Sequence, residues 1–484
     1  MQFSDTTLWP RMHLRISATL GRVVKHILAI LILLALLLLT MTRNVAPDPY
    51  VYDEADYMYA ASLGFAANFT DTPTLPSADF LRIGLARGTD AAQRQALSQQ
   101  IRARDDVVFY RHWHGPLYLY ALIPVSRLGL TERQTRMAML AIPALTLAVI
   151  YCGCLWLIPG RSGTFAALAA GVLFLSSNAV VASTELAPHQ LFALWSVGFL
   201  FLLSKFVVTG RSACWYGAVV AAGLAFCTLE VAFVLLGTLV ICGYLERGRP
   251  RAGWRMAGRS LALFVAVVVV VWPAALFKLS FVKGYLFMAY LGLFRKAAWG
   301  NEGIWEVWGR RVLDSPLEWV AIAASLFLCF RWRGNSGHRA YPMLVYAALM
   351  LAATARVVSS ATRYSLLFVP ALDIFAALTL GPVLALSRAW YGVAALFCGF
   401  LGADEYREFI RNRSPDPRPP AVLNYIRENR LEESTLLVPQ EDLPMIHYYF
   451  PRAHLRGYYD LKPEPTGNTR ILNRGYPLRI ESQR

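Results

Sequence analysis

Long apolar segments recur along the chain, and each is bounded by basic or polar residues. An α-helix needs about 20 apolar residues to cross the hydrocarbon core of a bilayer, and several of these segments approach that length. Hydrophobic residues make up 56% of the 484 residues and charged residues only 16%, which is too apolar for a soluble protein of this size. The sequence therefore predicts an all-α polytopic membrane protein with roughly eleven transmembrane helices. The expected spans are 27–41, 136–158, 163–182, 191–208, 214–229, 231–245, 258–276, 317–330, 340–355, 364–386 and 389–404.

The basic residues predict how these spans are oriented. The formal net charge of +16 comes from residues between the apolar segments, which is the positive-inside pattern and argues against a nucleic-acid partner. Residues 1–26 carry Arg11, Arg15 and Arg22, so we expect this N-terminal segment to be cytoplasmic. No small-residue cleavage site follows the span 27–41, which predicts a retained anchor. All seven cysteines lie in or beside apolar segments, without the spacing of disulfide frameworks or metal ligands.

One apolar segment, Pro116–Leu130, is too short to cross a bilayer and is interrupted by Pro124. We interpret it as an interfacial helix that lies at the membrane surface. If it crossed, the arginine-rich loop 247–259 would face outward, against the positive-inside rule. The segment 214–245 could form one long span or two short ones separated at Glu230, and the same loop favours two.

Three polar regions are expected on the outer side of the transmembrane domain 27–404. The first outside loop, 43–135, contains the interfacial helix, and its stretch 90–106 is typical of a surface helix. A second outside segment is 277–318. The last region, 405–484, is a proline-containing linker followed by a small α/β domain outside the membrane. Its predicted elements are a helix at 421–430 and strands at 435–439 and 455–459.

An acidic cluster directly follows the first span. Charges such as those of Asp53 and Glu54 are costly beside hydrocarbon unless water or a ligand meets them, so the cluster is either a functional site or the solvated start of a loop. A carboxylate beside a cation is a suitable general base, and arginine can bind a phosphate through its planar donor fork. Further polar residues that reach the same outer surface in the predicted topology are His112, His114, Glu185, Arg363 and Tyr364.

Each of these residues also has a structural explanation. Glu185 could cap a helix, the two histidines could be polar groups at the membrane interface, and Arg363 could extend its charge to the headgroups. Glu230, at the outer edge of a span, is interpreted as structural. Because His112 and His114 have no third ligand nearby in the sequence, we expect no metal.

The residues at these positions, taken together and in order, resemble the GT-C glycosyltransferases, and the nearest branch is the protein O-mannosyltransferase and aminoarabinose-transferase group. The resemblance covers about residues 27–390. The matching residues are Asp53, Glu54 and Tyr57 after the first span, His114, Pro116, Leu117 and Tyr118 at the end of the first loop, Arg133 or Arg136 at the next span, Glu185 in the second outside loop, and Arg363, Tyr364 and Pro370 near a late span.

The resemblance implies a membrane enzyme that takes a sugar from a polyprenyl-phosphate carrier and transfers it to a lipid, glycan or protein acceptor on the non-cytoplasmic face. In that family the residue that matches Asp53 is the proposed base, so Asp53 and Glu54 are the expected catalytic residues. Basic residues near the outer surface bind the carrier phosphate in the family, and the candidates here are Lys283, Arg295 and Lys296, which alternate with aromatic residues in 277–318. An ordinary aromatic belt has a similar composition.

The sequence departs from the family pattern at three places. The usual His-Pro-Pro-Leu is His114-Gly115-Pro116-Leu117 here, Glu185 stands where the family has Asp, and residues 68–110 form a long insert. No cofactor is expected, because fixed cations can take the charge of a departing phosphate. Two other functions are compatible with a polytopic membrane protein, a secondary transporter and a lipid-linked-glycan flippase without catalysis. Transporters place charged sites near mid-membrane, whereas these acidic residues gather at one face.

Overall fold

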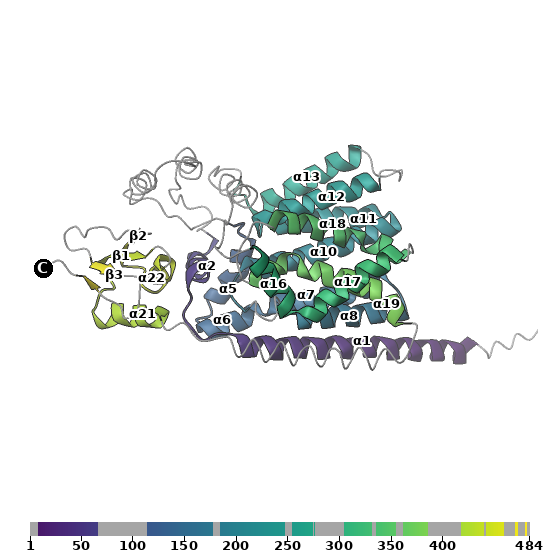
Figure 1. Cartoon of the computed structure of the whole chain (residues 1–484), viewed down its shortest axis with the longest axis horizontal. Helices are drawn as coiled ribbons and strands as arrows, with labels where there is room; N and C mark the ends of the chain where they lie inside the picture. Colours follow the sequence, from purple (N-terminus) through teal and green to yellow (C-terminus); the bar gives the residue numbers. More distant parts are fainter. Residues whose placement is uncertain are drawn as a thin grey trace, which may run out of the picture.

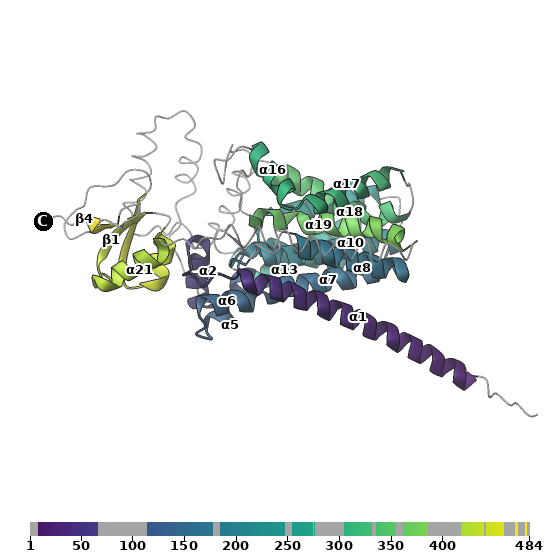
Figure 2. The same cartoon turned by 60° about the horizontal axis from the view of Figure 1, so that its bottom comes forward.

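The computed structural model describes residues 8–65, 114–177, 184–246, 254–273, 275, 304–331, 335–354, 362–385, 418–439, 442–458, 470–472 and 480–481. A bundle of roughly parallel and antiparallel helices forms most of the molecule, and a small domain lies beyond one end of it (Figure 1). Helix α1 runs along the edge of the bundle, and its first residues lie at the end opposite to the small domain (Figures 1 and 2).

Helix α1 extends from Leu8 to Asn44 and so begins well before the predicted span 27–41. Its apolar side chains are unusually exposed, with Leu28 at 57% and Leu31 at 55% of their full accessible area. Exposed apolar area of this extent is unfavourable in water, by about 25 cal/mol per Å², but not in lipid. Within the described residues, three helices are long and apolar enough to cross a membrane, namely Val23–Asn44, Glu132–Leu157 and Pro188–Thr209.

Apart from Ile304–Asp314, a helix within the predicted outside segment 277–318, the remaining bundle helices follow the predicted apolar segments within a few residues. Shorter helices than predicted occur at several positions, while the predicted span 389–404 lies outside the described residues. The number of spans therefore stays a prediction. The helices are α7 (Ala141–Leu157), α8 (Arg161–Ser176), α10 (Pro188–Thr209), α11 (Ser212–Phe226), α12 (Phe233–Leu245), α13 (Trp254–Val271), α16 (Ile304–Asp314), α17 (Pro316–Arg331), α18 (Asn335–Thr354) and α19 (Val369–Leu384).

Helix α10 lies in the middle of the bundle, between α7, α11 and α18 (Figure 1). Its large aromatic side chains, including Phe192, Phe199 and Phe206, are fully buried among these neighbours. The helix ends at Gly210, which adopts a left-handed conformation with φ of 65° that glycine reaches without strain. Helices α8 and α19 pack closely, and a Cβ on Gly381 would lie 2.7 Å from the Cβ of Ala166.

The apolar segment 214–245 forms two helices. Helix α11 ends at Phe226, and after Cys227–Leu229 the short 3₁₀ helix η2 (Glu230–Ala232) leads into α12. The predicted division at Glu230 is thus present in the structure. Whether each helix crosses the membrane separately stays a prediction.

Three short helices gather at the end of the bundle near the small domain (Figure 1). They are α2 (Tyr52–Ser62), α5 (Leu117–Ser126) and α6 (Glu132–Met139), and Thr131 caps α6 in a capping box with Gln134. Helix α5 has ten residues and contains Pro124. At 1.5 Å per residue it measures about 15 Å, about half the thickness of the hydrocarbon core. This length fits the predicted interfacial helix, whereas the predicted surface helix 90–106 lies outside the described residues.

The C-terminal domain, the described part of residues 418–481, is a small α/β unit. Its sheet has the order β2-β1-β3-β4, in which β1 is parallel to β2 and β3, and β3 is antiparallel to β4. The predicted strand at 435–439 is present with those bounds, and the predicted 455–459 strand is shifted by one residue. The elements are α21 (Arg418–Glu428), β1 (Thr435–Pro439), α22 (Leu443–Tyr449), β2 (His454–Tyr458), β3 (Arg470–Leu472) and β4 (Ile480–Glu481).

Candidate active site

The acidic pair lies in the first turn of α2, where the partial positive charge of a helix N-terminus favours carboxylates. Successive residues of an α-helix point about 100° apart, so Asp53 and Glu54 cannot face the same surroundings. The side chain of Glu54 is 9% exposed, and that of Asp53 is 46% exposed. One carboxylate is therefore part of the packed interior and the other is open to solvent.

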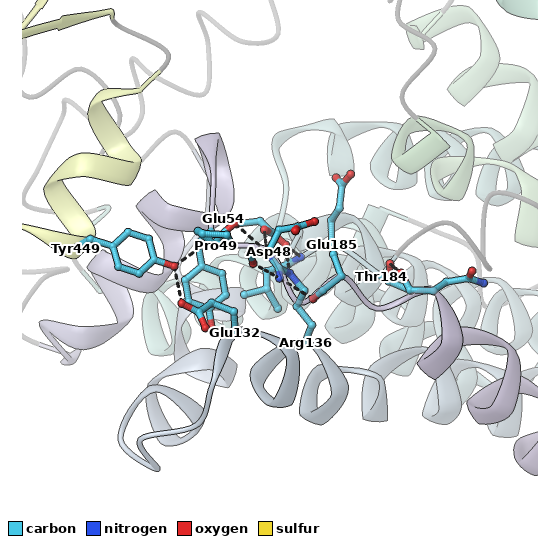
Figure 3. A network of polar contacts seen from close by, with 12 residues as sticks. Asp48, Pro49, Glu54, Glu132, Arg136, Thr184, Glu185 and Tyr449 are labelled. Atoms are coloured by element: carbon cyan, nitrogen blue, oxygen red, sulfur yellow. Dashed lines mark hydrogen bonds and ion pairs between the residues drawn. The ribbon is translucent and has the colours of Figure 1, made fainter. Parts of the chain in front are cut away.

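Glu54 is fully engaged by the protein. Arg136 of α6 donates from Nε to Glu54 Oε1 at 3.0 Å and from a terminal nitrogen to Oε2, so the pair is bidentate. The backbone N–H of Leu186 donates to the same Oε1 at 2.7 Å. Figure 3 shows Glu54 and Arg136 facing each other, while the carboxylate of Glu185 points away from them. Because Glu54 is buried and both of its carboxylate oxygens accept hydrogen bonds from the protein, it belongs to a structural ion pair.

Arg136 also fixes the linker between α1 and α2. Its second terminal nitrogen donates to the carbonyl oxygens of Ala46 at 2.9 Å and Asp48 at 2.7 Å. The carbonyl of Asn44, the last residue of α1, accepts a hydrogen bond from the hydroxyl of Thr184 at 3.1 Å. The buried guanidinium thus holds backbone carbonyls of the linker between the end of α1 and the acidic pair. The position of Asp53 depends on this network.

Arg363 is the cation beside Asp53. It lies on the 3₁₀ helix η3 (Thr362–Leu367), just before the predicted span 364–386. The α-helix of that span begins only at Val369. One terminal nitrogen lies 3.2 Å from Asp53 Oδ2, and the other lies 3.8 Å from Glu185 Oε2. Burial lowers the pKa of Arg363, but Tyr364, Asp53 and Glu185 raise it more, so the guanidinium stays charged. Asp53, Glu185 and Arg363, predicted separately, meet here.

A second ion pair joins His114 to Glu230. The Nδ1 of His114 lies 2.7 Å from Glu230 Oε2, and both side chains are largely buried. Burial lowers the pKa of His114, but the charge and the hydrogen bond of Glu230, together with Asp53, outweigh it and raise the pKa above its usual value. The sequence indicates a structural role for Glu230. The structure instead makes it the direct partner of a predicted site residue.

Gly115 allows this pairing. A Cβ built on Gly115 would lie 2.1 Å from the carbonyl oxygen of Cys227, in the break between α11 and η2. The next residues are tied to the same carbonyl, since the N–H of Leu117 donates to it at 3.0 Å. The glycine that departs from the family pattern therefore lets the backbone after His114 contact the break that carries Glu230.

Aromatic rings line this cluster. The ring of Tyr57, one turn after Asp53, lies 6.0 Å from that of His114 and 5.7 Å from that of Tyr118. The ring of Tyr364 lies 5.5 Å from the Arg363 guanidinium and 5.5 Å from the ring of His189 in an edge-on arrangement. These rings restrict the rotamers of the charged groups between them.

Five predicted residues are brought together, and four lie outside the described residues. Asp53, His114, Glu185, Arg363 and Tyr364 share one end of the bundle. His112, Lys283, Arg295 and Lys296 belong to the part of the chain that the structure does not describe. In the described part, no group of three or more His, Cys, Asp or Glu side chains could hold a metal ion, and the expectation of a metal-free site stays a prediction.

Glu230 is a further candidate for this site because it pairs with His114, although the sequence indicates a structural role for it. One signal was available, because a carboxylate between two apolar segments is costly unless it has a partner. The partner itself could not be named, since Glu230 and His114 are 116 residues apart.

Comparison with known proteins supports the predicted fold. No protein-family model matches the sequence, and no curated protein matches it. Among solved structures, ArnT from Cupriavidus metallidurans, bound to undecaprenyl phosphate, superposes with a TM-score of 0.58 over 89% of this chain and 85% of that chain, at 15% identity. Its apo state gives 0.57 over 91% and 86%, at 16% identity.

A second similar structure is the oligosaccharyltransferase AglB from Archaeoglobus fulgidus in complex with an inhibitory peptide and a dolichol-phosphate. The TM-score is 0.53 at 13% identity, over 88% of this chain and 64% of that chain. ArnT and AglB are both GT-C fold glycosyltransferases. The predicted GT-C-like fold of a helical membrane protein is confirmed, and identities this low show the fold alone.

Proposed function

We propose that this protein is a membrane glycosyltransferase that moves a sugar from a polyprenyl-phosphate carrier to a lipid, glycan or protein acceptor. The observation that carries the proposal is the half-exposed Asp53 beside the charged Arg363, at one end of a bundle with the GT-C fold. The similar ArnT and AglB structures hold undecaprenyl phosphate and a dolichol-phosphate, which is the carrier chemistry proposed here.

Asp53 is the proposed general base. It takes the proton of the acceptor hydroxyl as the oxygen attacks the anomeric carbon, and the bond between that carbon and the carrier phosphate breaks. Arg363 places a positive charge 3.2 Å from the carboxylate of Asp53. The Arg363 side chain is 27% exposed, so part of its guanidinium is accessible to an anion. The leaving phosphate departs with the electron pair of the broken bond.

Glu54, predicted as catalytic together with Asp53, is assigned a positioning role in this proposal. Both of its oxygens already accept hydrogen bonds, from Arg136 and from the Leu186 N–H. A buried carboxylate with these partners is a poor acceptor for a substrate proton. It orients the first turn of α2 and thereby Asp53.

His114 and Glu185 are proposed to contact the reacting groups. Glu230 holds His114 as an imidazolium, which places a second cation at the site for a developing negative charge. Glu185 is 57% exposed and shares Arg363 with Asp53, so it can accept hydrogen bonds from sugar hydroxyls.

The proposed carrier-phosphate residues in 277–318 remain Lys283, Arg295 and Lys296. Their basic and aromatic surroundings favour an anionic lipid. Replacing all three with glutamine is expected to raise the KM for the carrier. An unchanged KM would leave only an aromatic belt at this segment.

The site is proposed to face the periplasm or the extracellular side of a plasma or inner membrane. The site and the C-terminal domain lie at one end of the bundle, and α1 begins at the other end, which carries the predicted cytoplasmic residues (Figure 1). At that end Lys205 donates to the carbonyl of Trp156 at 2.6 Å and lies over its ring, as expected at a membrane interface. Cysteine labelling that found position 251 and the C-terminal domain on the same side would contradict this orientation.

The test is turnover by the purified protein in lipid vesicles. A synthetic polyprenyl-phosphate sugar and extracted envelope acceptors should give free polyprenyl phosphate and a glycosylated acceptor, both measured by mass spectrometry. Arg363→Gln should lose most of this turnover, whereas the distant Arg452→Gln should keep it. Movement of the intact lipid-linked sugar across the vesicle without release of polyprenyl phosphate would instead identify a flippase, and uptake of a soluble solute would identify a transporter.

A further inference from the structure

The last three residues of α22, in the C-terminal domain, all contact the segment that carries the acidic pair. The ring of His447 lies 4.1 Å from that of Tyr59, in α2. Tyr448 meets Tyr50 edge-on at 5.4 Å between ring centroids. The hydroxyl of Tyr449 accepts a hydrogen bond from the backbone N–H of Tyr50. These contacts join the C-terminal domain to residues 50–59, the segment that contains Asp53.

Tyr449 makes two directed hydrogen bonds with its single hydroxyl (Figure 3). The backbone N–H of Tyr50 donates to this oxygen at 2.9 Å, and the hydroxyl donates to Oε1 of Glu132 at 2.7 Å. Burial and the hydrogen bond to Glu132 raise the pKa of Tyr449, so the hydroxyl remains protonated at all ordinary pH values. The oxygen thus bridges the linker before α2 and the first residue of α6.

Tyr50 also contacts the buried ion pair between Arg136 and Glu54. Its ring is almost fully buried and lies 5.1 Å from the guanidinium of Arg136, which binds Glu54. Tyr449 therefore holds the backbone of a residue whose ring covers the key arginine. Only Val51 and Tyr52 separate Tyr50 from Asp53.

The interface is also apolar and continuous. Buried side chains of α2, such as Ala55 and Met58, belong to the same hydrophobic cluster as Val438, Met445 and Ile446 of the C-terminal domain. A shared core of this kind resists movement of the domain as a free module. It allows a hydrogen bond in the domain to set a position in the site.

We propose that Tyr449 is a positioning residue for the transfer reaction, through which the C-terminal domain holds the Tyr50 backbone and so sets the direction of Asp53. This inference rests on the proposed function. Tyr449 does not touch the reacting atoms and acts through Tyr50. The C-terminal domain is accordingly a part of the active-site frame.

The test is Tyr449→Phe, with Tyr448→Phe as the matched control. Both variants remove one hydroxyl from neighbouring tyrosines and keep the ring, but the Tyr448 hydroxyl has no hydrogen bond in the described part of the chain, whereas Tyr449 has two. Loss of a buried hydrogen bond that fixes the base is expected to lower kcat about tenfold, with KM for the carrier unchanged. Tyr448→Phe should keep the wild-type kcat.

Hydrogen exchange of the peptide covering residues 50–58 gives a readout that needs no turnover. In Tyr449→Phe these amides should exchange faster than in the wild type and in Tyr448→Phe, while amides of α10 should be unchanged. Faster exchange with a tenfold lower kcat supports the proposal. Unchanged exchange, or faster exchange with the wild-type kcat, overturns it.

The two proposals fail in different ways. If the wild type turned over no lipid-linked sugar, the proposed transferase function would be overturned and the positioning role with it. If the wild type were active and Tyr449→Phe equalled it in kcat, only the positioning role would be overturned. A fall in kcat that Tyr448→Phe shared would also overturn it, because both changes would then act through packing.

Discussion

Two arginine–carboxylate pairs start from adjacent residues of α2 and differ in almost every respect. Glu54 and Arg136 are buried, bidentate and joined to four further backbone groups. Asp53 and Arg363 are joined through one oxygen at 3.2 Å, and their side chains are 46% and 27% exposed. The buried pair has every donor and acceptor occupied, and the exposed pair keeps some of them for a ligand.

One turn of α2 therefore carries both a carboxylate that stabilises the fold, Glu54, and a carboxylate that can take part in the reaction, Asp53. A buried ion pair is favourable only when its geometry is good and its remaining polar atoms are satisfied, and the Arg136 pair meets both conditions. An exposed pair contributes little to stability, so the charge at the Asp53 position is better explained by chemistry than by folding. The following changes test this division, in order of expected size.

Asp53→Asn should have the largest effect, and on turnover alone. The amide keeps the size of the side chain but cannot accept the acceptor's proton, so kcat should fall by on the order of 10²–10⁴. Thermal unfolding in detergent should match the wild type. A well-folded Asp53→Asn with full turnover would remove Asp53 from the mechanism, and a lower melting temperature with normal turnover per folded molecule would make it structural.

Glu54→Gln should show the opposite pattern. Removal of this charge leaves the buried Arg136 without its counter-charge, which is expected to cost about 3–5 kcal/mol of folding stability. Turnover per folded molecule should fall less than in Asp53→Asn. If the melting temperature of Glu54→Gln equalled that of the wild type, the architectural role of this pair would be wrong.

Gly115→Ala tests the contact that positions His114. The added Cβ would overlap the Cys227 carbonyl, so the backbone must shift, at a cost of about 1–3 kcal/mol. We expect a lower melting temperature together with a lower kcat, because His114 moves relative to Glu230. Gly129→Ala is the control for backbone strain, since a Cβ there meets nothing within 4 Å while its φ of 62° disfavours alanine.

Glu230→Gln should change the pH dependence of turnover. Glu230 raises the pKa of His114. Two other charged groups act on this histidine, since Asp53 raises its pKa and Arg363 lowers it. Because the pKa of His114 is raised in the folded protein, the imidazolium persists to higher pH than in a free histidine. Its contribution to turnover is lost as the pH rises through the folded-state pKa. Without Glu230, burial dominates and His114 loses its proton at lower pH.

The alkaline limb of kcat/KM should therefore move to lower pH in Glu230→Gln. His114→Gln should lack this limb altogether, and wild-type kcat/KM measured across the same range provides the reference. An alkaline limb at the wild-type pH in Glu230→Gln would contradict the assigned pairing.

Arg452→Ala should have the smallest effect. This arginine pairs with Glu433 at 3.3 Å, but the two side chains are 82% and 74% exposed. Exposed pairs contribute about 0–1 kcal/mol, and this one lies in the C-terminal domain away from the acidic pair. A change in melting temperature as large as that of Glu54→Gln would show that burial does not explain the difference between the pairs.

The sequence by itself determined the helices and the kind of charge at their ends. Long apolar runs bounded by arginine or glycine form helices here, because an α-helix satisfies all backbone groups in lipid within its own segment. The strand at Thr435–Pro439 and the helix break before Glu230 could be predicted for similar local reasons. Asp53 was also recognisable, since a charge at the membrane edge needs an explanation.

Only the tertiary structure decided which charge meets which partner. Arg136 and Glu54 are 82 residues apart, and His114 and Glu230 are 116 apart. Helical periodicity predicts that Asp53 and Glu54 point in different directions. The orientation of α2 about its own axis, relative to α6 and α22, decides which of them is buried. That orientation is set by side-chain packing between distant segments, and no local pattern in the sequence encodes it.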